Sequence, residues 1–202
     1  MSDPTPEPPV RPGSRGPYAK TAARRAAIVD AAREVFAASG YRAGSIQAVA
    51  DACGISQSAV LHHFPAKEDL LLAVLADRDA RGDDVQAGHD LFGGTLAQAR
   101  HNESVPGIIE LYTTLCGEAT GAGHPAHDYF ATRFRRTREH YADEFRSLAA
   151  AGRLREGVDP DLAGASLVAL WDGAQLQWLM EPGAVNVTAQ LRHFLSLCVL
   201  PA

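Results

Sequence analysis

The fold is decided by the stretch SIQAVADACGISQSAVLHHF, residues 45–64, which predicts two short helices joined by a tight turn. Ser45 and Ser56 are suited to cap the N-termini of the two helices. Ala50 is small enough to let two helix backbones approach each other. Gly54, four residues further on, can adopt the positive φ that a tight turn requires. The stretch therefore has the pattern of a helix-turn-helix.

The flanking segments complete a compact helical unit. Between residues 21 and 39 apolar residues recur at spacings of three and four, which predicts a first helix that Gly40 is suited to end. Pro65 ends the third helix, because the residue before a proline avoids helical geometry. A fourth helix is expected from about residue 66 towards residue 81.

The third helix is expected to present one face to DNA. Val60 and Phe64 point towards the first two helices, so the residues on the other faces of this helix point outward. In a helix-turn-helix this helix lies in the major groove, with its N-terminal residues nearest the base edges. Gln57 can pair with adenine through two hydrogen bonds, and Ser58 can contact bases more loosely. The predicted exposed residues are Gln57, Ser58, Ala59, Leu61 and His62.

Basic residues are concentrated in the first third of the chain, although its net charge is −5. Residues 11–67 hold eight Lys or Arg against three Asp or Glu, whereas residues 68–202 hold eleven Arg against nineteen acidic residues. This split predicts a phosphate-binding surface joined to an acidic body that DNA repels. The sequence leaves open whether Arg11, Arg15 and Lys20 contact DNA as an arm or form a solvated tail.

From Thr21 to Leu75 the chain resembles the TetR family of repressors. The resemblance rests on VFAASGYRAGSIQAVADACGIS followed by QSAVLHHFPAKEDLLLAVL, residues 35–75. It implies a homodimer that binds double-stranded operator DNA, and a divergent C-terminal domain whose small-molecule ligand relieves repression. It also implies that Ser45 and Lys67, at the starts of two helices, contact phosphate. Leu61 stands where the family commonly has Tyr, so the operator sequence stays open.

Beyond Gly82 the sequence predicts further helices and no strand, so we expect an all-α protein of about nine helices. The predicted ranges are 90–102, 105–120, 125–150, 160–180 and 187–199. We expect three parts: a disordered, basic and Pro-rich arm over 1–19, a helix-turn-helix domain over 20–66, and a ligand-binding and dimerisation domain over 67–202.

Aromatic and polar residues of the C-terminal part predict the wall of a ligand pocket. Apolar pockets with a few placed polar groups suit small molecules. Asp172, Gln175 and Gln177 interrupt an otherwise apolar helix, and buried polar groups need partners, which the ligand or a second subunit can supply. Each residue of the wall can equally be ordinary core. The predicted wall consists of Phe92, Tyr112, Cys116, Tyr129, Phe134, Trp171, Gln175 and Trp178.

The last two helices are predicted to form the dimer interface as half of a four-helix bundle. The final helix carries one apolar stripe, and Leu197 and Leu200 begin a second one. A helix that buries a single face needs only one such stripe. The predicted interface residues are Leu176, Val187, Leu191, Phe194, Leu195 and Cys198.

An alternative class of function, a helical enzyme or a metal-binding protein, would use His124, His127 and Asp128. They complete no metal-ligand set, and the sequence has neither a nucleotide-binding loop nor an activated nucleophile. We therefore expect no catalytic activity, metal or cofactor. The basic run over 133–138 is interpreted as a solvated, ion-paired helix face, because acidic residues follow one turn later.

Two further expectations concern the environment of the protein. Three widely spaced cysteines among apolar neighbours are expected to be reduced thiols. The sequence has no apolar run of membrane-spanning length and no signal-peptide pattern at its start, so we expect a soluble, cytoplasmic protein.

Overall fold

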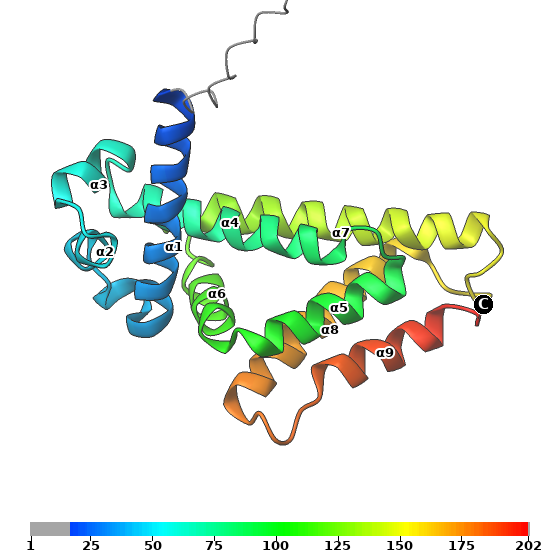
Figure 1. Cartoon of the computed structure of the whole chain (residues 1–202). Coiled ribbons are helices and arrows are strands. Elements are labelled where there is room, and N and C mark those ends of the chain that lie inside the picture. Colours follow the sequence, from blue (N-terminus) through cyan, green and yellow to red (C-terminus); the bar gives the residue numbers. More distant parts are fainter. Residues whose placement is uncertain (1–16, 202) are drawn as a thin grey trace, which may run out of the picture.

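The computed structural model describes residues 17–201, which form nine α-helices and no named strand (Figure 1). The expectation of an all-α fold is confirmed. Most of the predicted arm, including Arg11 and Arg15, lies outside the described residues, but residues 17–19 and Lys20 already belong to the first helix. The helices are α1 (Pro17–Ala43), α2 (Ile46–Cys53), α3 (Gln57–His63), α4 (Lys67–Gln86), α5 (Leu91–Ser104), α6 (Pro106–Glu118), α7 (His127–Ala150), α8 (Pro160–Met180) and α9 (Val187–Cys198).

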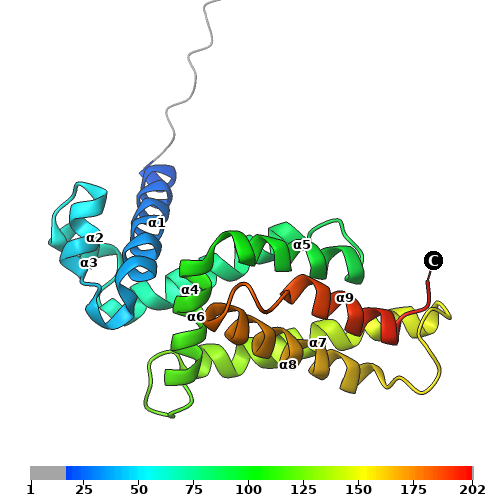
Figure 2. The ribbon, with the colours of Figure 1, turned by 90° about the horizontal axis from the view of Figure 1, so that it is seen from below.

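The helix-turn-helix forms as the sequence predicts. The Ser45 side chain accepts a hydrogen bond from the backbone N–H of Ala48, and Ser56 accepts one from Ala59, so both helices have N-caps. Gly54 ends α2 with a φ of 63°, a left-handed conformation that glycine adopts without a steric penalty. Figures 1 and 2 show α2 and α3 beside α1 at one end of the molecule, with α5–α9 extending away from it.

Two helix ends differ from the prediction. The first helical segment extends to Ala43 and has a break at Gly40, whose φ of 74° is not helical. The helix α4 continues past Gly82 to Gln86, because Gly82 faces the side chain of Gln98 on α5 and not a turn. Close packing against α5 therefore explains why position 82 is glycine. The spacing of residues in the sequence does not reveal this contact.

One apolar core joins the helix-turn-helix to the body of the protein. Phe36, Val60 and Phe64 are buried, and they belong to the same cluster as Leu71 on α4 and Ile109 on α6. Burial of each such side chain contributes about 1.5–3 kcal/mol. The recognition helix therefore moves with α1 and with the start of α4.

The helices α7 and α8 pack so closely that a glycine is required between them. A Cβ on Gly164 would lie 2.7 Å from the backbone nitrogen of Ala142. The helix α9 covers the same region, and it buries Leu191 and Leu195 in a second core with Leu167 (Figure 2). Among residues 17–201 no helix is both long enough and apolar enough to cross a membrane.

Candidate functional site

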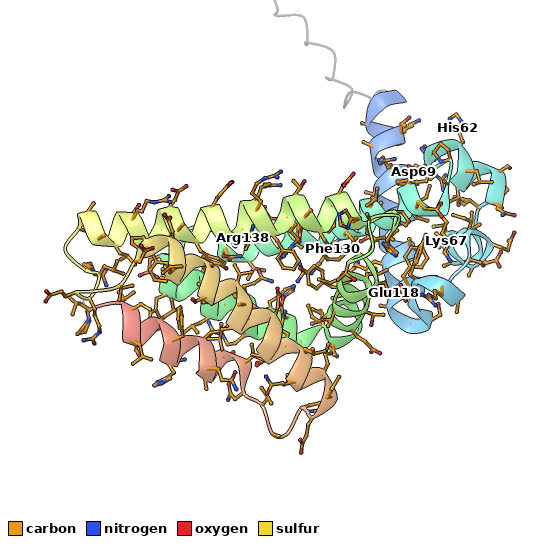
Figure 3. All side chains as sticks on the ribbon, turned by 180° about the vertical axis from the view of Figure 1, so that it is seen from behind. His62, Lys67, Asp69, Glu118, Phe130 and Arg138 are labelled. Carbon is orange, nitrogen blue, oxygen red and sulfur yellow. The ribbon has the colours of Figure 1, made fainter. Side chains whose placement is uncertain are left out.

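The outer face of α3 carries the predicted base-reading residues. Gln57, Ser58, Leu61 and His62 are exposed, while Ala59 is half-buried. Within the described part of the chain the Gln57 amide makes no hydrogen bond, so its donor and acceptor are both available to a base. Figure 3 shows His62 at the end of the molecule that the helix-turn-helix forms.

Arg25 on α1 holds the far end of α3 in place. Its Nη1 donates to the carbonyl oxygen of His63 at 3.0 Å, and its guanidinium lies 4.0 Å from the centre of the Phe64 ring. Sequence analysis did not single out Arg25, because its signal there was that of one basic residue among eight. The contact gives the recognition helix a rigid support on the opposite side from its exposed face.

The two predicted phosphate-contacting residues lie at helix starts, as expected. Ser45 accepts a hydrogen bond from α2, which leaves its own O–H free to donate to phosphate. The Lys67 ammonium donates to the carbonyl of Arg42 at 3.2 Å and lies 4.5 Å from the centre of the Tyr41 ring. Since an ammonium has three N–H groups, Lys67 can keep this contact and reach phosphate as well. Burial and the Glu68 carboxylate raise the pKa of Tyr41 to about 12.

Seven of the eight predicted pocket residues lie on α6, α7 and α8 around the middle of the C-terminal body. The Phe130 ring centroid lies 5.2 Å from that of Tyr112, 5.1 Å from that of Tyr129 and 6.4 Å from that of Phe134. Cys116 and Trp178 pack against the same core, Trp171 belongs to the second core, and Gln175 is buried beside them.

Phe92 packs on the second core, as Trp171, Phe134 and Trp178 do, but it faces a different space from the one predicted. It lines a half-open cavity of about 750 Å³ that lies between the start of α5, the end of α7 and the C-terminal segment. The other walls of this cavity include Leu148, Arg153 and Val199, and none of the other seven predicted residues lines it. Residue type alone could not place Phe92, because α5 crosses to the far end of the body.

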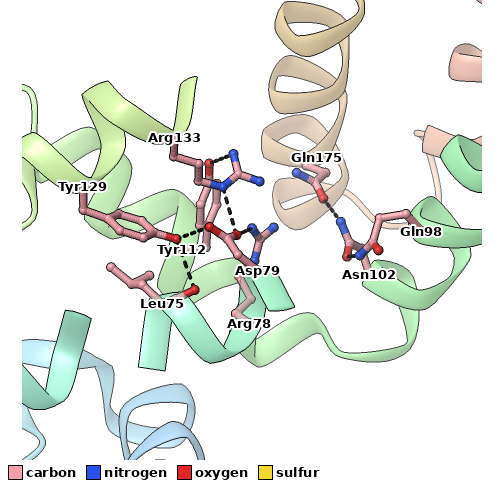
Figure 4. A network of polar contacts seen from close by, with 9 residues as sticks. All are labelled: Leu75, Arg78, Asp79, Gln98, Asn102, Tyr112, Tyr129, Arg133 and Gln175. Carbon is pink, nitrogen blue, oxygen red and sulfur yellow. Dashed lines mark hydrogen bonds and ion pairs between the residues drawn. The ribbon is translucent and has the colours of Figure 1, made fainter. Parts of the chain in front are cut away.

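A polar network connects α4, α6 and α7 inside this body (Figure 4). Arg133 Nε donates to Asp79 at 3.0 Å, and Arg133 Nη1 donates to the Tyr112 hydroxyl at 2.7 Å. The Tyr129 hydroxyl lies 2.5 Å from the second oxygen of Asp79, and Arg78 donates to the first at 2.9 Å. The interpretation of residues 133–138 as a solvated face is therefore wrong for Arg133, whose partner is 54 residues away.

The carboxylates of this region have opposite electrostatic surroundings. Burial alone would raise the pKa of Asp79, but Arg133, the Tyr129 hydroxyl and Arg78 outweigh it and lower the pKa below its usual value. Burial raises the pKa of Asp172, against the smaller effects of Arg133 and Arg78. Among the described residues Asp172 makes no hydrogen bond, and its side chain is half-buried.

Gln175 has its partner within the chain. The Asn102 amide donates to Gln175 Oε1 at 2.6 Å, and Gln98 donates to Asn102 Oδ1 at 2.7 Å (Figure 4). Neither a ligand nor a second subunit is needed to satisfy that oxygen. Asp172, half-buried on the same helix, makes no such contact among the described residues.

The side chains of His124 and His127 form hydrogen bonds with the backbone. His127 Nδ1 lies 2.8 Å from the carbonyl oxygen of Ala119, and His124 Nδ1 accepts from the N–H of Ala126 at 3.2 Å. Within residues 17–201 no group of three or more His, Cys, Asp or Glu side chains could hold a metal ion. The enzyme or metal-binding alternative gains no support from these contacts.

Most of the residues predicted for the dimer interface face the interior of their own chain. Val187, Leu191, Leu195 and Cys198 are buried inside their own chain, so a partner cannot reach them, and Phe194 is half-buried. Leu176, by contrast, is exposed as predicted. The helices α8 and α9 expose a different apolar set, consisting of Leu162, Leu176, Met180 and Leu197.

Two family models match the chain. The model described as "Bacterial regulatory proteins, tetR family" matches residues 28–74, and that of the "BetI-type transcriptional repressor, C-terminal" matches residues 124–199. The first covers the helix-turn-helix and the start of α4. The second covers α7 to α9, and together they span well over half of the chain.

Individual proteins agree with these matches. The chain is 31% identical to the transcriptional regulator UidR of Escherichia coli over 103 residues, which is 48% of this chain and less than half (45%) of that relative. It is 27% identical to the repressor KstR2 of Rhodococcus jostii over 86% of this chain and 88% of that one. The structure of SmeT, the repressor of a Stenotrophomonas maltophilia multidrug efflux pump, superposes on this chain with a TM-score of 0.73 at 20% sequence identity. The superposition covers 89% of this chain and 92% of SmeT. A structure of SmeT in complex with triclosan is also known.

Proposed function

Because this chain belongs to the TetR family of bacterial regulatory proteins, we propose that it is a homodimeric transcriptional repressor that binds a palindromic operator and releases it when a small molecule binds. The observation that carries the proposal is the outer face of α3. Gln57 is exposed and unpaired at the start of that helix, while Val60 and Phe64 are buried behind it. This is the geometry that a major-groove reader requires.

Each exposed residue of α3 has a proposed part in DNA recognition. Gln57 and Ser58, nearest the helix start, read base edges, with Gln57 suited to adenine. Leu61, which is 37% exposed, and the half-buried Ala59 offer apolar surface to a thymine methyl group. His62 supplies a further polar contact, and Ser45 and Lys67 contact phosphates on either side.

For the dimer we propose the exposed apolar residues of α8 and α9 as the interface. Met180 is 79% exposed, Leu162 69% and Leu197 57%, and a second subunit would remove this apolar surface from water. The inward stripe of α9 holds the helix on its own chain, so that the outward residues form one half of an isologous four-helix bundle. Changing Met180 and Leu197 together to Asp should produce a monomer in sedimentation, whereas a dimer that persists would place the interface elsewhere.

For the ligand we propose the body of the protein around Asp172, within the predicted ligand-binding part over 67–202. A ligand that gives this half-buried carboxyl a partner acts next to Arg133 and Tyr112, and the network there reaches α4 through Asp79. The start of α4 directly follows the recognition helix. The complex of SmeT with triclosan supports a small-molecule site in a chain of this fold.

Release of the operator needs only a modest change in geometry. Two recognition helices must lie about 34–36 Å apart to enter successive major grooves. A ligand that binds the wider or narrower dimer more tightly by a few kcal/mol moves the population from mostly bound to mostly free.

The proposal is tested by selecting bound sequences from random duplexes with the purified full chain. We expect a palindrome or near-palindrome whose binding weakens steeply with salt. Lys67→Ala should weaken binding about equally on all operators, while Arg136→Gln, an exposed arginine on α7, serves as the matched control and should not. A chain indifferent to every duplex at low ionic strength would contradict the proposal. A reporter gene under the selected operator separates repression from activation.

A further inference from the structure

A small cavity lined largely by polar residues lies where α1 meets α4, α5 and α6. Its volume is about 100 Å³. Ile108 and Ile109 of α6 provide its apolar side. Its polar lining residues are Arg33 from α1, Arg78 and Arg81 from α4, and Gln98, His101 and Asn102 from α5.

The cavity wall is basic. No Asp or Glu lines it, whereas three arginines and a histidine do. The carboxylates that pair with the arginines stand behind the wall: Asp30 with Arg33 and Arg81, Asp77 with Arg81, and Asp79 with Arg78. They hold the guanidinium groups in position. Because each guanidinium has five N–H groups, donors remain for a ligand in the cavity.

Two buried atoms of the lining have complementary needs. Among residues 17–201, Arg33 Nε is a donor without an acceptor, and Gln98 Oε1 is an acceptor without a donor. The Gln98 amide cannot simply be turned over, because its nitrogen donates to Asn102, whose own amide donates to Gln175. Buried polar groups are satisfied in most proteins, so a bound molecule that accepts from Arg33 and donates to Gln98 would complete this lining.

We propose that this cavity binds a small oxyanion that also carries an O–H group, such as dihydrogen phosphate or a two-carbon hydroxycarboxylate. Its charged oxygens accept from Arg33 and the neighbouring arginines, and its O–H donates to Gln98 Oε1. The volume corresponds to about three water molecules, which suits a ligand of this size. The site shares Arg78 with the network of the proposed effector region, and its occupation ties α1 to α5.

The matched ligands are glycolate and acetate, which carry the same charge and differ by one hydroxyl group. Calorimetric titration of the full-length dimer at fixed ionic strength and mildly acidic pH should give one saturable site per chain. Glycolate should bind about five-fold more tightly than acetate, because only glycolate can donate to Gln98. Inorganic phosphate is titrated in parallel. The tighter of phosphate and glycolate identifies the source of the oxyanion, and either result supports the site.

Two variants locate the binding. Arg33→Gln and Gln98→Glu should each weaken glycolate and phosphate at least ten-fold, the second by placing a negative charge against the anion. Arg136→Gln, on the surface of α7, should leave both affinities unchanged. Circular dichroism and the melting temperature check that the variants fold. If Arg33→Gln does not fold, the anion affinity of Gln98→Glu alone tests whether the anion binds in this cavity.

The inference is overturned if neither anion saturates a site at a concentration of 10 mM, which is about ten times a Kd in the millimolar range. It is also overturned if both variants bind like the parent, since the anions would then occupy the DNA-binding surface. Equal affinity for glycolate and acetate would remove the role of Gln98 and with it the proposed ligand class. None of these results bears on operator binding, which is measured separately.

Discussion

Replacement of Arg133 by methionine tests the buried network most sharply. Methionine keeps the apolar part of the side chain but removes both hydrogen bonds that the guanidinium donates, to Asp79 and to Tyr112. Hydrogen bonds to charged groups contribute about 1.5–3 kcal/mol, and breaking a buried ion pair costs about 3–5 kcal/mol. Asp79 retains Arg78 and Tyr129, so we expect the lower end, about 3 kcal/mol.

The assay is urea unfolding at one fixed protein concentration, because the stability of a dimer depends on concentration. Arg136→Met on the exposed face of the same helix is the control and should stay within about 0.5 kcal/mol of the parent. The double variant with Asp79→Asn should lose at least about 1 kcal/mol less than the sum of the single variants. A loss below about 1 kcal/mol for Arg133→Met, or strict additivity in the double variant, would refute the network as described.

Three further predictions concern the recognition helix, the α7–α8 contact and the Asp172 carboxyl. Ser56→Ala removes the N-cap of α3 and should cost about 1 kcal/mol in thermal unfolding, with weaker operator binding. Gly164→Ala should cost about 1–3 kcal/mol by overpacking α7, whereas Gly173→Ala, with open space beside it in the same helix, should be neutral or stabilising in the same assay. Asp172→Asn should raise the free energy of unfolding at neutral pH, because the carboxyl has its pKa raised in the folded state. That gain should shrink as the pH falls from the pKa of Asp172 in the folded chain to its unfolded value of 3.8. Between these two values the parent protein takes up a proton on Asp172 when it folds, so the cost of keeping the carboxyl charged disappears.

Each of these three has a clear contrary result. An unchanged melting temperature for the Ser56 variant would mean that the cap contributes nothing. Equal effects at the two glycines would mean that α7 and α8 can move apart freely. For Asp172→Asn, a loss of stability at neutral pH, or a gain that grows on acidification, would show that the carboxyl has a partner in the folded chain.

The helix-turn-helix could be predicted closely because its signals are local. Ser45, Ser56, Gly54 and Pro65 each act within one turn of their own position, so the helix ends follow from residue type and spacing. The order and approximate bounds of the later helices followed from the same kind of signal. The chain outside residues 17–201 contributes nothing to this comparison.

The predictions that failed depended on partners far along the chain. Arg133 reads as a surface residue beside its basic neighbours, and only the position of Asp79 on α4 explains its burial. The helix α9 is apolar on two sides, so the sequence could not say which side faces its own chain and which stays exposed. Phe92 was misplaced for a similar reason, since the path of α5 determines which cavity it lines.

The most direct test of the proposed regulator is a comparison of base preferences for the parent and Gln57→Ala, measured by selection from the same random duplex pool. Gln47→Ala, an exposed glutamine on α2, is the matched control. We expect Gln57→Ala to lose its preference at one base pair in each half-site, worth about 1–3 kcal/mol, while all other positions keep theirs. If the preference is unchanged at every position, the outer face of α3 does not read the operator in the way proposed.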